Sequence, residues 1–398
     1  MHAEIAQLVE QQLPKLQVAG SSPVFRSSMR PGRSPTCQVS VFCTFVMNMD
    51  PFLLIIDFLL LIFSFGAMHV ISKRYFIESL DFLSKKMRLS SDMAGSTLMA
   101  AGSSAPELAV ALFAILMAGH HEAIGVGTIV GSALFNILVI TGVVMYIKGK
   151  AKLVWQPIFR DIIFYIIAIL IIGYVFHSGE VNLLSGLLMM ATYVVYVIVV
   201  YYWKRLFPYE DIEGEANKND SPEPALSHGK IARVNIFDRL AARYQIMTFI
   251  ISIGLISLLS WLLVSAAVGI SEALGVPEIL IGITIVAVGT SVPDLISSVI
   301  VARQGRPGMA INNAIGSNTF DILVGLGLPF LLYALIYKEK INLLTGNLVM
   351  STSILMGSSV ILLLFFLLSK WRTSRLVGII LFILYLLYLA HMICTNTC

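Results

Sequence analysis

The sequence predicts an all-α polytopic membrane protein with ten transmembrane helices, arranged as two inverted five-helix repeats. Three observations support this fold class. Of the 398 residues, 57% are hydrophobic and only 13% are charged, whereas soluble domains carry about 25% charged residues. The apolar residues gather in ten runs, each close to the roughly 20 residues that cross a bilayer. A pair of polar motifs also occurs once in each half of the chain.

Short polar connections separate the predicted spans, apart from one long hydrophilic segment near the middle. The spans cover residues 51–72, 94–118, 123–147, 158–177, 181–203, 246–269, 277–302, 308–336, 344–369 and 374–394. The N-terminal stretch is polar and shows no apolar period, which is typical of disorder. We therefore expect four parts: a disordered N-terminal extension (1–46), a first five-helix repeat (47–203), a linker (204–245) and a second five-helix repeat (246–398).

The positions of Lys and Arg predict the orientation in the membrane, because cytoplasmic connections are enriched in both. Of the 27 Lys and Arg residues, 21 fall in or beside the odd-numbered connections and two in the even-numbered ones. We therefore expect a plasma (inner) membrane protein with a cytoplasmic central linker and both termini outside. Because each half has an odd number of spans, the second repeat must run upside down relative to the first, as in alternating-access transporters.

The repeated motif is Gly-Ser-Ser-Ala-Pro-Glu in the first half and Gly-Thr-Ser-Val-Pro-Asp in the second, ending at Glu107 and Asp294. A second motif follows each copy: Gly-Ser-Ala-Leu-Phe-Asn ends at Asn136 and Gly-Ser-Asn-Thr-Phe-Asp ends at Asp321. The spacing between the motif ends is 29 residues in the first half and 27 in the second. An internal repeat of this kind fixes the architecture before any single element is assigned.

The acidic residues of these motifs lie inside predicted spans. An ionised carboxylate at mid-membrane costs at least about 2.5 kcal/mol. Glu107, Asp294 and Asp321 have no Lys or Arg within their own spans. We therefore expect the missing positive charge to be a bound, exchangeable cation. Protonated structural acids are the alternative, but that alternative does not explain why a repeat places three of them.

The residue types around the acids indicate which cation. A proline directly before each acid is expected to interrupt the helix and to free the carbonyl one turn earlier, next to Ser103 and Thr290. Ser132 and Ser317 stand four residues before the end of the second motif, hence on the same helical face as its last residue. Carboxylate, carbonyl and hydroxyl oxygens suit Ca2+, which takes six to eight ligands. The spans concerned contain no His or Cys, which disfavours zinc and copper.

Together, the two motif pairs resemble the two alpha repeats of the cation/calcium exchanger superfamily. The second copy, which continues through residues 295–303, is most similar to the potassium-dependent sodium/calcium exchangers. The resemblance covers residues 51–394 and implies a ten-helix inverted repeat in which inward movement of Na+ drives Ca2+ outward. No cofactor is implied beyond the transported ions, and the expected partners are Ca2+, Na+ and the lipid bilayer.

The resemblance also implies roles for individual residues. Glu107 and Asp294 bind Ca2+ and share Na+ sites, and Asn136 and Asp321 complete the cluster. Further oxygens come from the positions of Ser103, Ser104, Thr290, Ser291, Ser132 and Ser317. An acid at the position of Asp321 accompanies potassium dependence in one branch but also occurs in sodium-only relatives, so K+ transport is left open. Ala133 departs from the family pattern, since many members have Asn there, as at Asn318.

The sequence thus predicts a secondary active antiporter that exchanges Na+ for Ca2+. Protons would also neutralise the carboxylates, so Ca2+/H+ antiport is the alternative. A more distant one is an intramembrane aspartyl protease using Asp294 and Asp321, but its Gly-x-Gly-Asp signature is missing. A passive channel would not need proline-broken acidic motifs in both halves. The chain shows no basic stripe interleaved with aromatic residues, so we expect no nucleic-acid partner. As an antiporter, the protein is not expected to be an enzyme.

The remaining charged residues suggest simpler roles. Arg160 and Asp161 open the fourth span, where we expect Asp161 to face the helix N-terminus. His121 and Glu122 are expected to be solvated in the connection between the second and third spans. Asp57 lies about two turns into the first span and is expected near the membrane interface.

Overall fold

The computed structural model describes residues 51–76, 79, 82, 96–97, 100–117, 121–209, 244–303, 305–338, 341–342 and 345–397. The predicted N-terminal extension (1–46) and most of the predicted linker (204–245) lie outside these residues. Residues 50–398 belong to a single structural unit, with no separation between the two predicted halves.

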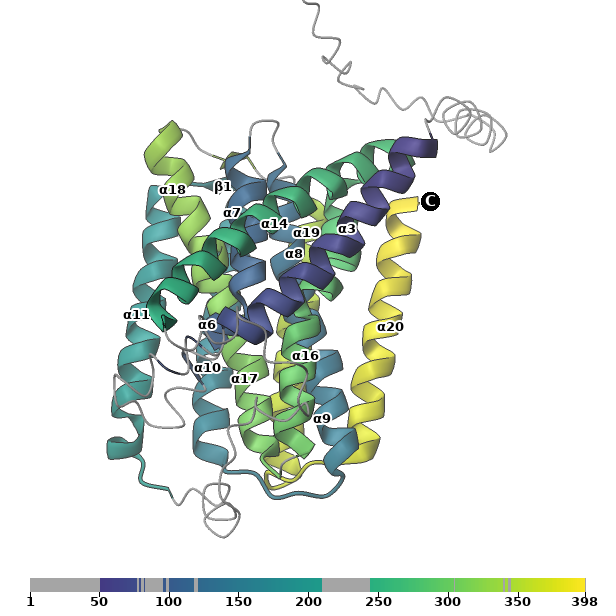
Figure 1. Cartoon of the computed structure of the whole chain (residues 1–398). Coiled ribbons are helices and arrows are strands. Elements are labelled where there is room, and N and C mark those ends of the chain that lie inside the picture. Colours follow the sequence, from purple (N-terminus) through teal and green to yellow (C-terminus); the bar gives the residue numbers. More distant parts are fainter. Residues whose placement is uncertain are drawn as a thin grey trace, which may run out of the picture. The chain divides into compact units, whose positions relative to one another are not determined.

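The described residues are almost entirely helical (Figure 1). In chain order the elements are α3 (Pro51–Ile71), η1 (Ser72–Phe76), α6 (Ala100–Ser103), α7 (Ala105–Leu116), α8 (Glu122–Leu134), η3 (Phe135–Ile140), α9 (Thr141–Lys148), α10 (Trp155–Ser178), β1 (Glu180–Val181), α11 (Leu183–Leu206), α14 (Gln245–Leu274), α15 (Glu278–Ile281), η4 (Gly282–Val286), α16 (Ala287–Arg303), α17 (Pro307–Phe320), η5 (Asp321–Leu326), α18 (Gly327–Tyr337), β2 (Ile341–Asn342), α19 (Thr345–Leu368) and α20 (Arg375–Thr397). The segments labelled η are π-helical.

Among the described residues, nine helical segments are long and apolar enough to cross a membrane, and they match nine of the ten predicted spans. The remaining prediction, 94–118, corresponds in its described part to the short helices α6 and α7, with a turn at Ser104 between them. Pro106 stands in the first turn of α7, where its missing N–H costs nothing. The chain therefore breaks at this motif, as predicted.

The second copy of the motif behaves differently. Helix α16 runs from Ala287 to Arg303 with Pro293 in its interior, so the interruption that we expected there is wrong. Proline still removes one helical hydrogen bond and leaves the carbonyl of Gly289 without that donor. Gly289 lies directly against α3, because a Cβ at this position would overlap the ring of Phe65. The neighbouring helix thus covers the glycine closely.

The even-numbered connections contact one another. In the second connection, His121 Nδ1 lies 2.9 Å from Oε1 of Glu278, which follows the sixth connection. In the fourth and eighth connections, β1 pairs with β2 in antiparallel fashion, Glu180 opposite Asn342 and Val181 opposite Ile341. These four connections therefore meet in pairs.

The odd-numbered connections form a second set. Lys148 Nζ, at the start of the third connection, donates to the Arg303 carbonyl of the seventh at 3.5 Å. Lys152 of the same connection forms a β-bridge with Arg372 of the ninth. The described contacts thus link odd connections with odd and even with even, as alternating spans require.

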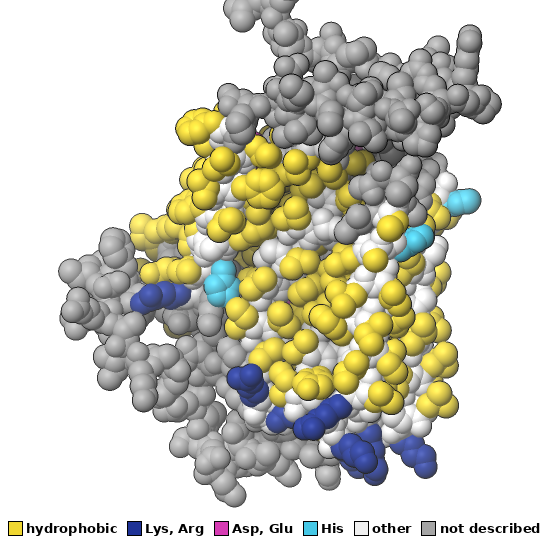
Figure 2. Space-filling view, turned by 90° about the vertical axis from the view of Figure 1, so that its right-hand side faces the viewer, with side chains coloured by type: hydrophobic (Ala, Val, Ile, Leu, Met, Phe, Trp, Pro, Cys, Tyr) yellow, Lys and Arg dark blue, Asp and Glu magenta, His cyan; other side chains and the backbone are white. Residues whose placement is uncertain are grey.

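The outer surface is suited to lipid. Large apolar side chains are exposed on the outward faces of several long helices, including Tyr174, Leu184 and Leu368. Figure 2 shows hydrophobic side chains across one face, with most of the Lys and Arg side chains of that view at its lower end. Apolar surface of this kind would be unusual on a soluble monomer. The described part of the chain is therefore a multi-pass membrane protein.

The motif-bearing helices form the interior. The segment from Glu122 to Lys148, which contains α8, η3 and α9, is almost wholly buried. It crosses the η4–α16 segment closely, because a Cβ at Gly131 would overlap the backbone of Ile283 and the side chain of Ala287. By contrast, α3 and α14 pack along each other at the near side of Figure 1. Close crossing of the inner helices brings the two motif pairs together.

Candidate ion-binding site

Three buried carboxylates form the centre of the candidate site. Glu107 lies in the first turn of α7, Asp294 on α16 and Asp321 at the first residue of η5. All three side chains are 0% exposed. The acids come from both halves of the chain, so neither half builds the site alone.

A row of hydroxyl groups connects two of these acids. Ser291 Oγ donates to Oε1 of Glu107 at 3.2 Å and lies 2.9 Å from Ser132 Oγ. Ser132 in turn donates to Oδ2 of Asp321 at 3.3 Å. Glu107 and Asp321 are therefore held apart by two serines, one from each half. The hydroxyl oxygens stand between the carboxylates, where a cation could use both kinds of ligand.

Two asparagines support the third acid. The side-chain amide of Asn136 donates to Oδ2 of Asp294 at 3.4 Å and to Oδ1 of Asn318 at 2.9 Å. Asn318 itself donates to the backbone carbonyl of Ala133 at 2.9 Å. Asn318 is not among the predicted site residues, although the sequence offered a signal, since it lies inside the Gly-Ser-Asn-Thr-Phe-Asp motif.

A pair of serines completes the contacts between the halves. Ser103 Oγ, on α6, lies 3.4 Å from Ser317 Oγ on α17. Both hydroxyls also interact with the Asp294 carboxylate. Asp294 therefore has polar neighbours from both repeats, the Asn136 amide and the Ser103 and Ser317 hydroxyls.

Two of the ten predicted site residues are placed differently from the rest. The Thr290 hydroxyl donates within its own helix, to the carbonyls of Val286 at 3.1 Å and Ala287 at 3.3 Å. The Ser104 hydroxyl, in the turn between α6 and α7, lies near the Asp321 carboxylate but without hydrogen-bond geometry. The structure thus brings eight of the ten residues together through side-chain contacts, whereas the Thr290 hydroxyl bonds to its own helix.

The cluster contains unused oxygen atoms. Within the described structure, five buried oxygens of the site have no hydrogen-bond partner: Glu107 Oε2, Asp294 Oδ1, Asp321 Oδ1, Asn136 Oδ1 and Ser104 Oγ. Buried polar atoms are normally paired, so each exception calls for an explanation. Oxygen ligands from carboxylate, amide and hydroxyl groups are those that Ca2+ and other hard cations prefer. The donor set therefore fits such a cation.

The carboxylates do not converge on one point by themselves. In the part of the chain that the structure describes, no three His, Cys, Asp or Glu side chains are grouped closely enough to hold a metal ion. A cation here would have to take the serine and asparagine oxygens that lie between the acids. Mixed, adaptable ligation of this kind favours an exchangeable hard cation over a tightly held structural metal.

Local backbone geometry places the second motif of each half. Asn136 is the second residue of the π-helix η3, and Asp321 is the first residue of the π-helix η5. A π-helical turn inserts extra backbone into a helix and occurs often at functional sites. In η3, the carbonyl of Asn136 accepts the hydroxyl of Thr141, five residues later, at 3.1 Å. The second motif of each half thus ends at the start of a π-helical segment.

The chain resembles known proteins in sequence. Residues 57–202 and 244–394 match the family described as "Sodium/calcium exchanger protein". The chain belongs to the sodium/calcium exchanger family. Members of this family are transporters, which excludes the protease alternative. Both matched regions contain one copy of each motif.

Several proteins with similar sequences are sodium/potassium/calcium exchangers. The chain is 25% identical to mouse sodium/potassium/calcium exchanger 4, over 83% of this chain and 80% of the relative. It is 26% identical to human exchanger 2, over 83% of this chain and 76% of the relative. It is 28% identical to human exchanger 5, over 84% of this chain and 82% of the relative.

Two solved exchanger structures share the fold. The sodium-calcium exchanger NCX_Mj superposes with a TM-score of 0.53 and 21% identity, covering 85% of this chain and 98% of that one. The H+/Ca2+ exchanger CAX superposes with a TM-score of 0.66 and 16% identity, covering 89% of this chain and 88% of that one. At this level of identity the likeness concerns the fold, which is that of an exchanger.

The unpaired carboxylates predict the effect of removing one charge. Asp321→Asn should raise the melting temperature of the detergent-solubilised protein in EDTA by about 2–4 °C, because it relieves repulsion and desolvation worth roughly 1 kcal/mol. Thermal unfolding followed by tryptophan fluorescence measures this shift. Glu272→Gln, which changes an exposed carboxylate, is the matched control and should leave the melting temperature unchanged. A lower melting temperature for Asp321→Asn would mean that the ionised cluster is stable without a cation.

Proposed function

We propose that this protein is a secondary active antiporter that exchanges Na+ for Ca2+ through the buried carboxylate cluster. The observation that carries the proposal is the set of five unpaired oxygens around three buried acids from both halves. Family membership and the names of the relatives support Na+ and Ca2+ as the substrates. The site offers the oxygen ligands that a desolvated cation needs, and the cation would supply the positive charge that the acids lack.

Charge neutralisation gives the mechanism. A single Ca2+ or two Na+ would compensate two of the three carboxylate charges, and a further Na+ would compensate the third. Ca2+ and Na+ would compete for the same oxygens. A site that carries uncompensated negative charge would be costly to move through a low-dielectric barrier. The protein would therefore change between inward- and outward-open states mainly when loaded. This coupling enforces exchange instead of leak.

Individual residues would divide the work. Glu107 and Asp294 would bind Ca2+ directly and share Na+ positions, with Asp321 and Asn136 completing the cluster. The hydroxyls of Ser103, Ser132, Ser291 and Ser317 would supply further oxygens, and Ser104 has a free one in the turn. Thr290 would contribute after rotating its hydroxyl away from the Val286 and Ala287 carbonyls.

Alternating access would rest on ten membrane-spanning segments in two inverted repeats, with α6 and α7 together forming the second segment. The matching π-helices η3 and η5 and the matched motifs support a structural repeat. Inversion is supported by the connections. The second connection, through His121, and the seventh, through Arg303, follow equivalent motifs but belong to the two different sets of connections.

The Lys and Arg distribution supports one orientation, with the odd connections in the cytoplasm and both termini outside. To test it, Lys150→Cys and Glu180→Cys, both at exposed positions, are made after replacing Cys37, Cys43, Cys394 and Cys398 by Ser. A membrane-impermeant maleimide should label residue 150 in inside-out vesicles only and residue 180 in right-side-out vesicles only. The reverse pattern would overturn the orientation.

Proton coupling is the second candidate. Protons would neutralise the same carboxylates, and the fold is shared with the H+/Ca2+ exchanger CAX at a TM-score of 0.66. The names of the sodium/potassium/calcium exchangers also make K+ a candidate co-substrate. The driving ion has to be settled by flux.

Ion dependence of transport tests the proposal. Purified protein in liposomes loaded with Na+ should take up 45Ca2+, whereas liposomes loaded with choline should not, because only an outward Na+ gradient can drive entry. Each condition is run with and without external K+ and with an imposed pH gradient. Uptake that follows the pH gradient and ignores Na+ would replace the proposal with Ca2+/H+ antiport. A K+ requirement would add K+ to the cargo.

Loss of the first acid should abolish transport. Glu107→Gln keeps the side-chain size but removes the charge that a cation would compensate, so Na+-driven 45Ca2+ uptake should fall below about 1% of wild type, in line with a large loss of ion-ligand energy. Glu272→Gln, outside the cluster, serves as the control at equal protein density. Exchange by Glu107→Gln with normal Ca2+ affinity would contradict the site.

A further inference from the structure

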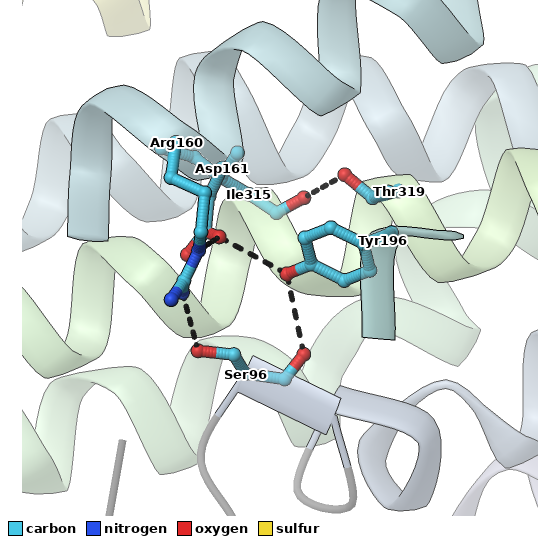
Figure 3. Close-up of polar contacts among 6 residues, drawn as sticks. All are labelled: Ser96, Arg160, Asp161, Tyr196, Ile315 and Thr319. Atoms are coloured by element: carbon cyan, nitrogen blue, oxygen red, sulfur yellow. Dashed lines mark hydrogen bonds and ion pairs between the residues drawn. The ribbon is translucent and has the colours of Figure 1, made fainter. Parts of the chain in front are cut away.

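A buried ion pair lies outside the carboxylate cluster. Arg160 and Asp161, in the second turn of α10, are 2% and 0% exposed, and Arg160 Nε lies 2.7 Å from Asp161 Oδ1. The sequence predicted that Asp161 faces the helix N-terminus; instead both side chains are buried, and Figure 3 shows Arg160 pointing toward Ser96 and Asp161 toward Tyr196. A buried pair of this kind needs further hydrogen bonds to offset its desolvation.

The pair gains those hydrogen bonds from two other parts of the chain. Arg160 Nη2 donates to Ser96 Oγ at 3.0 Å. Tyr196 Oη, from α11, donates to Asp161 Oδ1 at 3.1 Å and lies 3.5 Å from the Ser96 carbonyl oxygen. Figure 3 shows the Tyr196 hydroxyl between the carboxylate and Ser96. Ser96 is thus held through both its side chain and its backbone.

Ser96 is close to the candidate site. A Cβ at Gly316 would lie 3.2 Å from the Ser96 carbonyl oxygen and 3.7 Å from Tyr196 Oη. The next residue, Ser317, contacts Ser103 of α6, and α6 packs against α17. The Gly316–Ser317 dipeptide therefore touches the first repeat at Ser96 and again at Ser103, just before the break at which the chain turns toward Glu107.

The network belongs to one half of the chain. Helix α19 occupies the place in the second half that α10 occupies in the first, and its sequence contains no Asp, Glu, Lys or Arg. The motif of the second half lies within α16, which runs without a break from Ala287 to Arg303. In the first half a turn at Ser104 separates α6 from α7, and α6 has only four residues. Contacts with neighbouring elements therefore contribute to the position of α6.

We propose that Arg160, Asp161 and Tyr196 form a positioning network that holds Ser96, and with it α6, against Gly316 and Ser317, and thereby sets the cation affinity of the site. This inference rests on the proposed function. Arginine suits the role because its planar fork donates in two fixed directions, to Asp161 and to Ser96. Tyr196 closes the network from the other side. None of the three residues is proposed to touch the cation.

The smallest test removes one hydroxyl. Tyr196→Phe should weaken equilibrium binding of 45Ca2+ to the purified full-length protein, in detergent without Na+, by about three- to tenfold, as for residues that couple to a site at a distance. Tyr385→Phe is the matched control, because the Tyr385 hydroxyl is also buried but has no hydrogen-bond partner in the described structure. It should bind Ca2+ like wild type. If Tyr196→Phe bound Ca2+ as tightly as Tyr385→Phe and wild type, the proposal would be overturned.

A second variant separates positioning from stability. Replacing both charges, Arg160→Met with Asp161→Leu, should leave the melting temperature unchanged or raise it, because apolar pairs often replace buried ion pairs without loss. Ser96 would still lose its donor, so Ca2+ binding should weaken by about tenfold. Arg160→Lys should fall between this variant and wild type. Wild-type affinity in the stable double variant would show that the network has only a structural role.

The binding readout distinguishes this inference from the proposed function. If wild type binds Ca2+ but Na+ does not drive its uptake, Na+/Ca2+ exchange fails while the network test still applies. If wild type exchanges and Tyr196→Phe binds normally, only the network fails. Absence of Ca2+ binding by wild type would overturn both.

Discussion

The burial of negative charge is the constraint on which the rest of this structure depends. Glu107, Asp294 and Asp321 are fully enclosed, in predicted spans that contain no Lys or Arg. Such charges are expensive in a membrane and persist there when they have a function. The protein meets the cost only in part with its own groups, and leaves the remaining oxygens free. A transported cation would supply the missing positive charge and would bind the free oxygens.

The fold meets the constraint by crossing two similar helix pairs. Close approach at Gly131 lets the inner helices touch, and serines from both halves then bridge the acids. The halves are not equivalent in detail. Asn318 of the second half donates to the backbone carbonyl of Ala133 in the first half. Ala133 has only a methyl side chain, so it cannot make the equivalent hydrogen bond in return. The first motif is divided between α6 and α7, whereas the second lies within the continuous helix α16, so the two sides of the site differ in backbone geometry as well as in chemistry.

Asp161 shows the contrasting solution to the same problem. It is as deeply buried as the cluster acids, but it is neutralised by the adjacent Arg160 and bonded to Tyr196. A carboxylate with a fixed partner can hold elements together and cannot exchange its counter-charge. The cluster acids have hydroxyl and amide neighbours instead, which orient them without neutralising them. The choice of partner separates structural charge from charge suited to transport.

The sequence by itself determined the apolar spans, the pairing of the motifs and the acids at the centre, because hydrophobicity and repetition are local properties of the chain. Nine spans and the break before Glu107 are confirmed. Only the tertiary structure showed that the helix continues through Pro293, that the Thr290 hydroxyl bonds to its own helix backbone, and that Asn318 joins the two halves. These depend on helix register and on neighbours distant in sequence, which no local pattern records.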